Sequence, residues 1–301
     1  MSKSRWIRFV IYIFILLTIC ITFFIFKSFQ KELKGRTGAN LTFFETVKAV
    51  TTQNFDSSLE KDLKNSAMKK KVNNVTIHYN DQVEDLLPKT IQILTRADDK
   101  TMRLLGSYNM KPVDLIFLKS EDMKEFTGLK NVSGVYSDFD KLIGIHVFDE
   151  DIQKIVEEQK TESYFFQKSI LHEYTHYATN RKLDEIGVNN TIFPHWFIEG
   201  IAEYVGSDKT TVKYEPFNFK WLTLKELSSY NQWQDARLTE DVNPYLQSYF
   251  AINYLLEVYG ENTIHDVMER TKEKNDFYQA LEQVTRKELV DFENDLKDYY
   301  K

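Results

Sequence analysis

The stretch Ile170-Leu-His-Glu-Tyr-Thr-His-Tyr177 decides the fold of this chain. It contains His172, Glu173 and His176 in the order H-E-x-x-H. Residues four apart in a helix lie one turn apart on the same face, so both imidazoles can point at one ion. In this arrangement the two histidines bind zinc and the glutamate acts as a general base. The surrounding sequence predicts the helix that the motif needs, because residues 161–182 contain no Gly or Pro and place apolar side chains at helical spacing.

A third metal ligand is expected in Pro194-His-Trp-Phe-Ile-Glu-Gly-Ile-Ala-Glu-Tyr-Val205. Pro194 suits the first turn of a helix, which we expect over residues 194–206. Glu199 and Glu203 are then one turn apart. Two acids on a helix usually belong to a solvated face, but these two lie among aromatic and aliphatic residues. A carboxylate in such surroundings needs a partner, and a metal ion and its surroundings would supply one.

The pair HEYTH and WFIEGIAEYV resembles the gluzincin metallopeptidases, most closely the peptidase MA-like group, which shares its catalytic core with thermolysin and the zinc aminopeptidases. The resemblance covers about residues 70–301. It implies that His172, His176 and Glu199 hold zinc and that Glu173 is the general base. Glu203 matches an acid that orients a ligand histidine in that family.

Other assignments of the third ligand have less support. Glu203 or Asp184 would be next if Glu199 were not a ligand. The pattern H-E-x-x-H-x-x-G-x-x-H is excluded, because this chain has Thr179 and Lys182 where that pattern needs Gly and His.

Strand patterns precede a run of helical patterns, which predicts an α+β fold. Strands are expected at 75–79, 113–118, 134–136 and 142–148, with a helix at 83–105. Later helices are expected at 161–182, 194–206, 243–260, 263–270 and 277–300, and only a short one, at 224–227, within an irregular region 207–242. The resemblance implies a zincin-like domain: a small mixed sheet with an edge strand over the active-site helix, then a helical subdomain. The hairpin at 134–148 would carry that edge strand, although a purely structural hairpin remains an alternative.

The N-terminal region predicts a membrane anchor, because Phe9 to Phe26 is an apolar run with Lys and Arg on both sides. A cleaved signal peptide is the closest rival, but no small-x-small cleavage site follows directly. The expected organisation is a short basic cytoplasmic tail, a transmembrane helix, a polar stalk and a peptidase domain, at residues 1–8, 9–26, 27–70 and 71–301.

Charge is distributed unevenly along the chain. Seven of its 39 basic residues and one of its 45 acidic residues lie in residues 1–36, so the remainder carries a formal charge of −12. An acidic domain argues against nucleic acid as a partner. Lys and Arg flank the apolar run on both sides, so the positive-inside rule does not fix the topology. A short basic tail is more easily left inside, which predicts a single-pass cell-membrane protein with its catalytic domain outside.

Three protein ligands leave zinc a fourth position for water, which is typical of a catalytic site. The predicted reaction is hydrolysis of a peptide bond in a peptide or protein substrate, with zinc activating water and Glu173 taking its proton. The alternative is a membrane-anchored zincin-fold binding or regulatory protein without turnover, and the intact Glu173 argues against it. We assign no role to the remaining histidines, His78, His146, His195 and His265.

A tyrosine is expected to donate a hydrogen bond to the oxyanion, the negative charge that develops on the substrate's carbonyl oxygen during the reaction. The zinc aminopeptidases have this tyrosine in a P-Y-x-K-G context, and the resemblance transfers it to Tyr245 after Pro244. The match is partial, because Gln247 and Ser248 replace the Lys and Gly. Tyr249, one turn further on, is the alternative donor, and a structural role for Tyr245 is also open.

Overall fold

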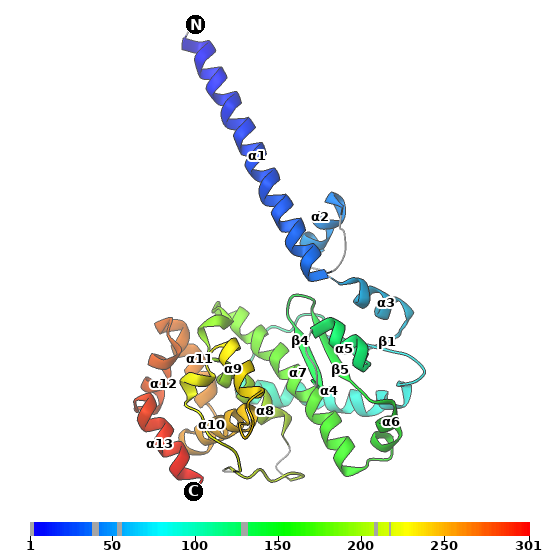
Figure 1. The fold of residues 1–301 in the computed structure, drawn as a ribbon, viewed down its shortest axis with the longest axis vertical. Helices are drawn as coiled ribbons and strands as arrows, with labels where there is room; N and C mark the ends of the chain where they lie inside the picture. The colour runs from blue at the N-terminus through cyan, green and yellow to red at the C-terminus, as the bar shows by residue number, and fades with distance from the viewer. Residues whose placement is uncertain (1–2, 38–41, 53–55, 128–131, 208–209, 217) are drawn as a thin grey trace. The chain divides into compact units, whose positions relative to one another are not determined.

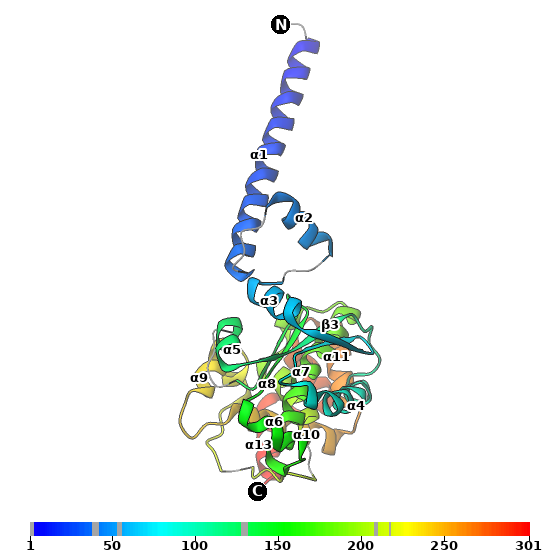
Figure 2. The same cartoon turned by 90° about the vertical axis from the view of Figure 1, so that its right-hand side faces the viewer.

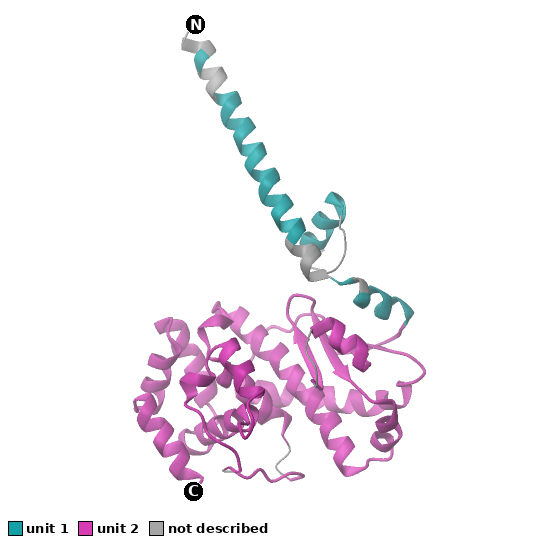
Figure 3. Cartoon of the chain, viewed as in Figure 1, with its two compact units in different colours: residues 1–66 teal, residues 67–301 magenta. Residues whose placement is uncertain are grey.

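The computed structural model describes residues 3–37, 42–52, 56–127, 132–207, 210–216 and 218–301 (Figure 1). The chain divides into two compact units, residues 1–66 and residues 67–301 (Figure 3). The predicted boundary between stalk and domain, at residue 70, lies four residues after this division.

The first unit consists of helices. α1 (Lys3–Thr37) contains the segment Ile11–Lys31, which is long and apolar enough to cross a membrane. It is followed by α2 (Phe43–Thr52) and α3 (Ser58–Ser66). The helix therefore extends beyond the predicted span 9–26 at both ends, because polar residues on either side of the apolar run continue its helical conformation.

The second unit contains one mixed five-stranded sheet with the strand order β1-β2-β3-β5-β4. The strands are β1 (Met68–Val72), β2 (Val75–Tyr79), β3 (Val113–Leu118), β4 (Gly134–Ser137) and β5 (Leu142–His146). β2, β3 and β5 run parallel, while β1 and β4 form antiparallel edges. The prediction of an α+β fold is confirmed at this level, and the predicted hairpin corresponds to β4 and β5.

β1 begins within the range predicted as stalk and crosses the predicted boundary at residue 70. A two-residue turn joins it to β2, since Val72 pairs with Val75. Asn73 in this turn has φ of 52°, a conformation that asparagine tolerates better than most residues and that tight hairpins require. The sheet therefore begins earlier than its hydrophobic pattern indicated.

α4 (Leu87–Leu105) and α7 (Lys160–Ile186) share one hydrophobic core with the sheet (Figure 2). Val75, Ile77, Leu115 and Ile143 are among the strand residues of this core. Pro88 lies in the first turn of α4, where its missing N–H costs no helical hydrogen bond. α7 is 27 residues long and ends at Gly187, whose φ of 72° provides the left-handed cap that stops it.

The remaining helices build the other half of the unit. They are α8 (His195–Gly206), α9 (Tyr230–Arg237), α10 (Pro244–Tyr259), α11 (Thr263–Lys274), α12 (Phe277–Thr285) and α13 (Leu289–Tyr299). Short helices were not predicted at α5 (Ser120–Thr127), α6 (Asp149–Val156), η2 (Asn190–Ile192) and α9. The predicted helix at 224–227 is confirmed as the 3₁₀ turn η3 (Leu224–Leu227). The helices that carry the motif residues, α7 and α8, lie within a few residues of their predicted bounds.

Candidate metal centre

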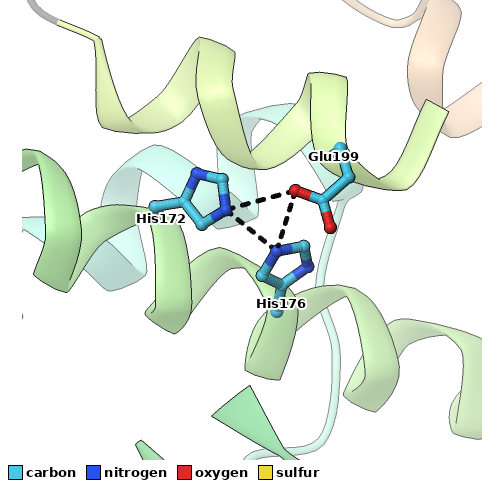
Figure 4. Close-up of side chains that lie close together, drawn as sticks. All are labelled: His172, His176 and Glu199. Atoms are coloured by element: carbon cyan, nitrogen blue, oxygen red, sulfur yellow. Dashed lines mark hydrogen bonds and ion pairs between the residues drawn. The ribbon is translucent and has the colours of Figure 1, made fainter. Parts of the chain in front are cut away.

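α7 places His172 and His176 side by side at the wall of a cleft (Figure 4). Their Nε2 atoms are 3.0 Å apart. Glu173, between them in sequence, also lines the cleft and is only 7% exposed. The helical spacing of the motif thus brings all three side chains to one cavity.

α8 brings Glu199 to the same place. Its Oε2 atom lies 3.4 Å from Nε2 of His172 and 3.7 Å from Nε2 of His176 (Figure 4). Gly206 allows α8 to approach α7, because a Cβ atom there would lie 3.1 Å from the carbonyl oxygen of Lys168. Gly200 does the same towards α10, where a Cβ atom would lie 2.6 Å from the carbonyl oxygen of Ser248.

These three residues fit a metal ion by their chemistry. One ligand atom from each lies within 4.8 Å of the others, and among the described residues this is the one such group of three. Two imidazole nitrogens and a carboxylate oxygen all present lone pairs to one point, which a cation between them would satisfy. Two histidines and one glutamate are also a ligand set of catalytic zinc sites.

Electrostatics in the cluster favour an anionic Glu199. Burial alone would raise its pKa, but the charge of His176 and hydrogen bonds with both histidines hold that pKa well below its usual value. For His172, burial opposes protonation, yet hydrogen bonds with Glu199 and Glu203 raise its pKa well above the usual value. A metal ion and a proton would therefore compete for His172.

Glu203 orients the ring of His172 from the side away from the cluster. Nδ1 of His172 lies 3.1 Å from Oε1 of Glu203, which leaves Nε2 free to face Glu199 and His176. Nζ of Lys168 lies 2.7 Å from the other oxygen of Glu203. Although burial opposes it, the hydrogen bond with His172 and the charge of Lys168 lower the pKa of Glu203. Its carboxylate can thus accept a hydrogen bond from His172.

Glu173 lies against the edge strand β4. A Cβ atom at Gly134 would be 2.6 Å from Cγ of Glu173 and 2.8 Å from its Oε1. Only glycine therefore leaves room for this carboxylate in its present position. Burial raises the pKa of Glu173, and the two histidines partly oppose that effect.

The two candidate oxyanion donors lie in different surroundings. Tyr245 lines the cleft, with its ring centroid 6.4 Å from that of His172 and 5.2 Å from that of Trp233. Burial raises its pKa. Tyr249 is 5% exposed, packs against Tyr214 and is not part of the cleft wall.

The cleft has a volume of about 660 Å³ and is open to solvent. His195, Tyr230 and Trp233 line it, although the sequence analysis gave them no role. The pattern His195-x-x-x-Glu199 is itself a helical pair and could have drawn attention to His195. Tyr230 and Trp233 come from α9, a helix that was not predicted.

The other residues considered lie outside this group. Asp184 is half exposed and forms ion pairs with Lys111 and Arg181. His78 contacts Asp114, and His146 contacts Ser120. His265 forms ion pairs with acids of its own helix, α11.

No family model matches the chain. The chain is 33% identical over 222 residues to the uncharacterized protein YhcO of Bacillus subtilis (strain 168). The match covers 73% of this chain and 68% of YhcO. The chain therefore belongs to the same family as YhcO.

Proposed function

We propose that this protein is a membrane-anchored zinc metallopeptidase of the gluzincin type, with a peptidase MA-like domain. One observation carries the proposal: ligand atoms of His172, His176 and Glu199 converge within 4.8 Å, with Glu173 beside them in an open cleft. The resemblance of the two motifs to those of gluzincins supports the same four residues as zinc ligands and general base. A mixed sheet with an antiparallel edge strand next to α7 is consistent with a zincin-like fold.

His172, His176 and Glu199 would hold the zinc ion. When bound, zinc lowers the pKa of coordinated water towards about 7 and polarises the substrate carbonyl. Glu173 accepts the proton of the attacking water on its carboxylate and passes it to the leaving amine. Its place in the cleft beside the three proposed ligands favours this role.

Two further groups would assist the reaction. The hydroxyl of Tyr245 donates a hydrogen bond to the oxyanion from within the cleft. Among the described residues, no strand pairs with the outer edge of β4, so an extended peptide can add to it beside Glu173. Gly134 lies at this junction and keeps the strand close to the general base.

Metal analysis combined with a peptide-library cleavage assay tests the proposal on the full-length chain in detergent. We expect about one zinc per chain and cleavage of peptides by the wild type. Glu173→Gln should retain zinc and lose about 10²- to 10⁴-fold in turnover, since an amide cannot accept the proton. Zinc without any cleavage would favour the binding-protein alternative. A wild type that binds no zinc would overturn the metal site itself.

We also propose that α1 remains as an uncleaved anchor and that the catalytic domain lies outside the cytoplasm. The apolar segment Ile11–Lys31 supports the anchor. Protease added to intact cells should digest the second unit. Digestion only after lysis would reverse the topology, and recovery of a chain without α1 would indicate a cleaved signal peptide.

A further inference from the structure

The two oxygens of Glu199 face different partners. Oε2 faces the two motif histidines, whereas Oε1 lies 3.5 Å from Nε2 of His195. His195 is the first residue of α8, one helical turn before Glu199. It does not belong to the group of converging ligand atoms among the described residues, and it reaches the cluster through Glu199.

His195 is held in this position by contacts from a separate part of the chain. Its backbone N–H donates a hydrogen bond of 2.7 Å to the carbonyl oxygen of Ser228. Its ring packs edge-to-face on Trp233, with centroids 5.1 Å apart, and on Tyr230, with centroids 5.7 Å apart. The indole of Trp233 is almost fully buried, which makes it a firm support.

We infer that His195 is a positioning residue for the metal centre, donating its Nε2–H to the free oxygen of Glu199. This inference rests on the proposed zinc site. A carboxylate can turn about its terminal torsion and offer a metal either one or both oxygens. A donor on Oε1 fixes that torsion and keeps Oε2 directed towards His172 and His176. Partners of this kind commonly change metal affinity 10- to 100-fold.

The same support reaches the opposite side of the cleft. Trp233 packs on His195 through one contact and on Tyr245 through another, with centroids 5.2 Å apart. The segment from Ser228 to Trp233 thus holds a partner of the third ligand and the candidate oxyanion donor at once. The positions of His195 and Tyr245 beside the metal centre consequently depend on α9, although α9 contributes no ligand.

Two substitutions separate the hydrogen bond from the packing. His195→Phe keeps an aromatic ring against Trp233 and Tyr230 but removes the N–H donor. His195→Gln places an amide N–H at a similar reach. His265→Phe on α11 is the control, because that histidine is a third exposed and away from the cleft. Thermal unfolding of each full-length variant checks that the fold is retained.

The readouts are zinc affinity by chelator competition and the visible absorption of Co²⁺-loaded protein, which reports ligand geometry. His195→Phe should bind zinc about 10-fold or more weakly and change the Co²⁺ spectrum. His195→Gln should stay within about threefold of the wild type, and His265→Phe should match it. Wild-type affinity and spectrum in His195→Phe would overturn the inference, as would equal losses in His195→Phe and His195→Gln. A wild type without zinc affinity would instead overturn the proposed function.

Discussion

The two motif histidines are one turn apart on α7, yet their surroundings differ. His172 has its Nδ1 atom fixed by Glu203 of α8, which Lys168 contacts in turn. Among the described residues, no hydrogen bond reaches Nδ1 of His176; its Nε2 pairs with Nε2 of His172, and its carbonyl oxygen accepts a hydrogen bond from Asn180. Helical spacing brings both rings to the cluster, but the packing of α8 fixes only one of them.

The end of α7 beyond His176 is tied to the sheet instead. Arg181, 1% exposed, pairs with Asp138 in the turn between β4 and β5. The hydroxyl of Tyr136 on β4 donates to the same carboxylate at 2.6 Å. One end of the motif is therefore held by a neighbouring helix and the other by the hairpin that forms the edge of the cleft.

The largest effect should come from removing either histidine, whatever its surroundings. His172→Ala and His176→Ala each delete one of the three proposed ligands. Structural zinc sites bind the ion with a free energy of about 10–16 kcal/mol. Divided over four coordination positions, each position contributes about 2.5–4 kcal/mol, so its loss lowers zinc affinity by about 10²- to 10³-fold. Chelator competition should show similar losses for both variants. A His176→Ala protein with wild-type affinity would show that His176 is not a ligand.

Tyr245, beside His172, should matter for turnover and not for zinc. Tyr245→Phe should lower kcat by about 10²- to 10³-fold while KM and zinc content change little, because only the charge of the transition state loses a donor. Tyr249→Phe is the matched control, one turn along α10 and outside the cleft wall. Steady-state kinetics on a cleaved peptide measure both. Normal turnover in Tyr245→Phe rules out this role.

Glu203→Ala tests whether the fixed ring of His172 matters for binding. Loss of the partner of Nδ1 should weaken zinc about 10- to 100-fold. Asn180→Ala, on the His176 side, should change affinity less than about threefold, because that contact goes to a backbone carbonyl. Equal losses of zinc affinity in the two variants would show that the surroundings of the two histidines do not differ in their importance for zinc binding.

The smallest effect should come from Asp138→Asn, which weakens the tie at the far end of α7. Burial opposes ionisation, but the hydrogen bond from Tyr136 and the charge of Arg181 lower the pKa of Asp138 below 3.8. Because the pKa of Asp138 is lower in the folded state, ionisation of this carboxyl stabilises the fold at pH values above its unfolded-state pKa. That stabilisation is lost as the pH falls through its folded-state pKa. At pH 7 the variant should be less stable by about 1 kcal/mol, because the carboxylate is partly exposed.

Urea unfolding at several pH values measures this difference. It should shrink as the pH falls below 3.8 and through the lowered pKa of Asp138, where the wild-type carboxyl becomes protonated as well. Zinc affinity should stay at the wild-type value, since Asp138 pairs with Tyr136 and Arg181 and not with the proposed ligands. A pH-independent difference would mean that the charge of Asp138 is not the cause.

The motif helices could be predicted because their signals are local. His172, His176 and Glu199 are recognisable from spacing within single helices, and so is the position of Glu203 one turn after Glu199. The strands β2, β3, β4 and β5 also followed from short apolar patterns such as Val75–Tyr79. These features depend on residues that are close in sequence.

Features formed by distant residues could not be predicted in this way. Trp233 supports His195 across 38 positions, and α9 has only Trp233 and Ala236 as buried residues to mark it as a helix. β1 contains Lys69, Lys70 and Lys71, so it lacks the alternation that indicates a strand. Its pairing with β2 depends on the Asn73 turn and not on burial.

Those lysines have a consequence for self-association. A sheet with a free edge can recruit the same edge of another molecule and aggregate, and charged side chains on an edge strand discourage this. β1 displays three consecutive lysines, all exposed, whereas β4 at the opposite edge carries no charged residue. Copies of this protein that meet through β1 repel one another, which makes strand addition there less favourable than at the edge that borders the cleft.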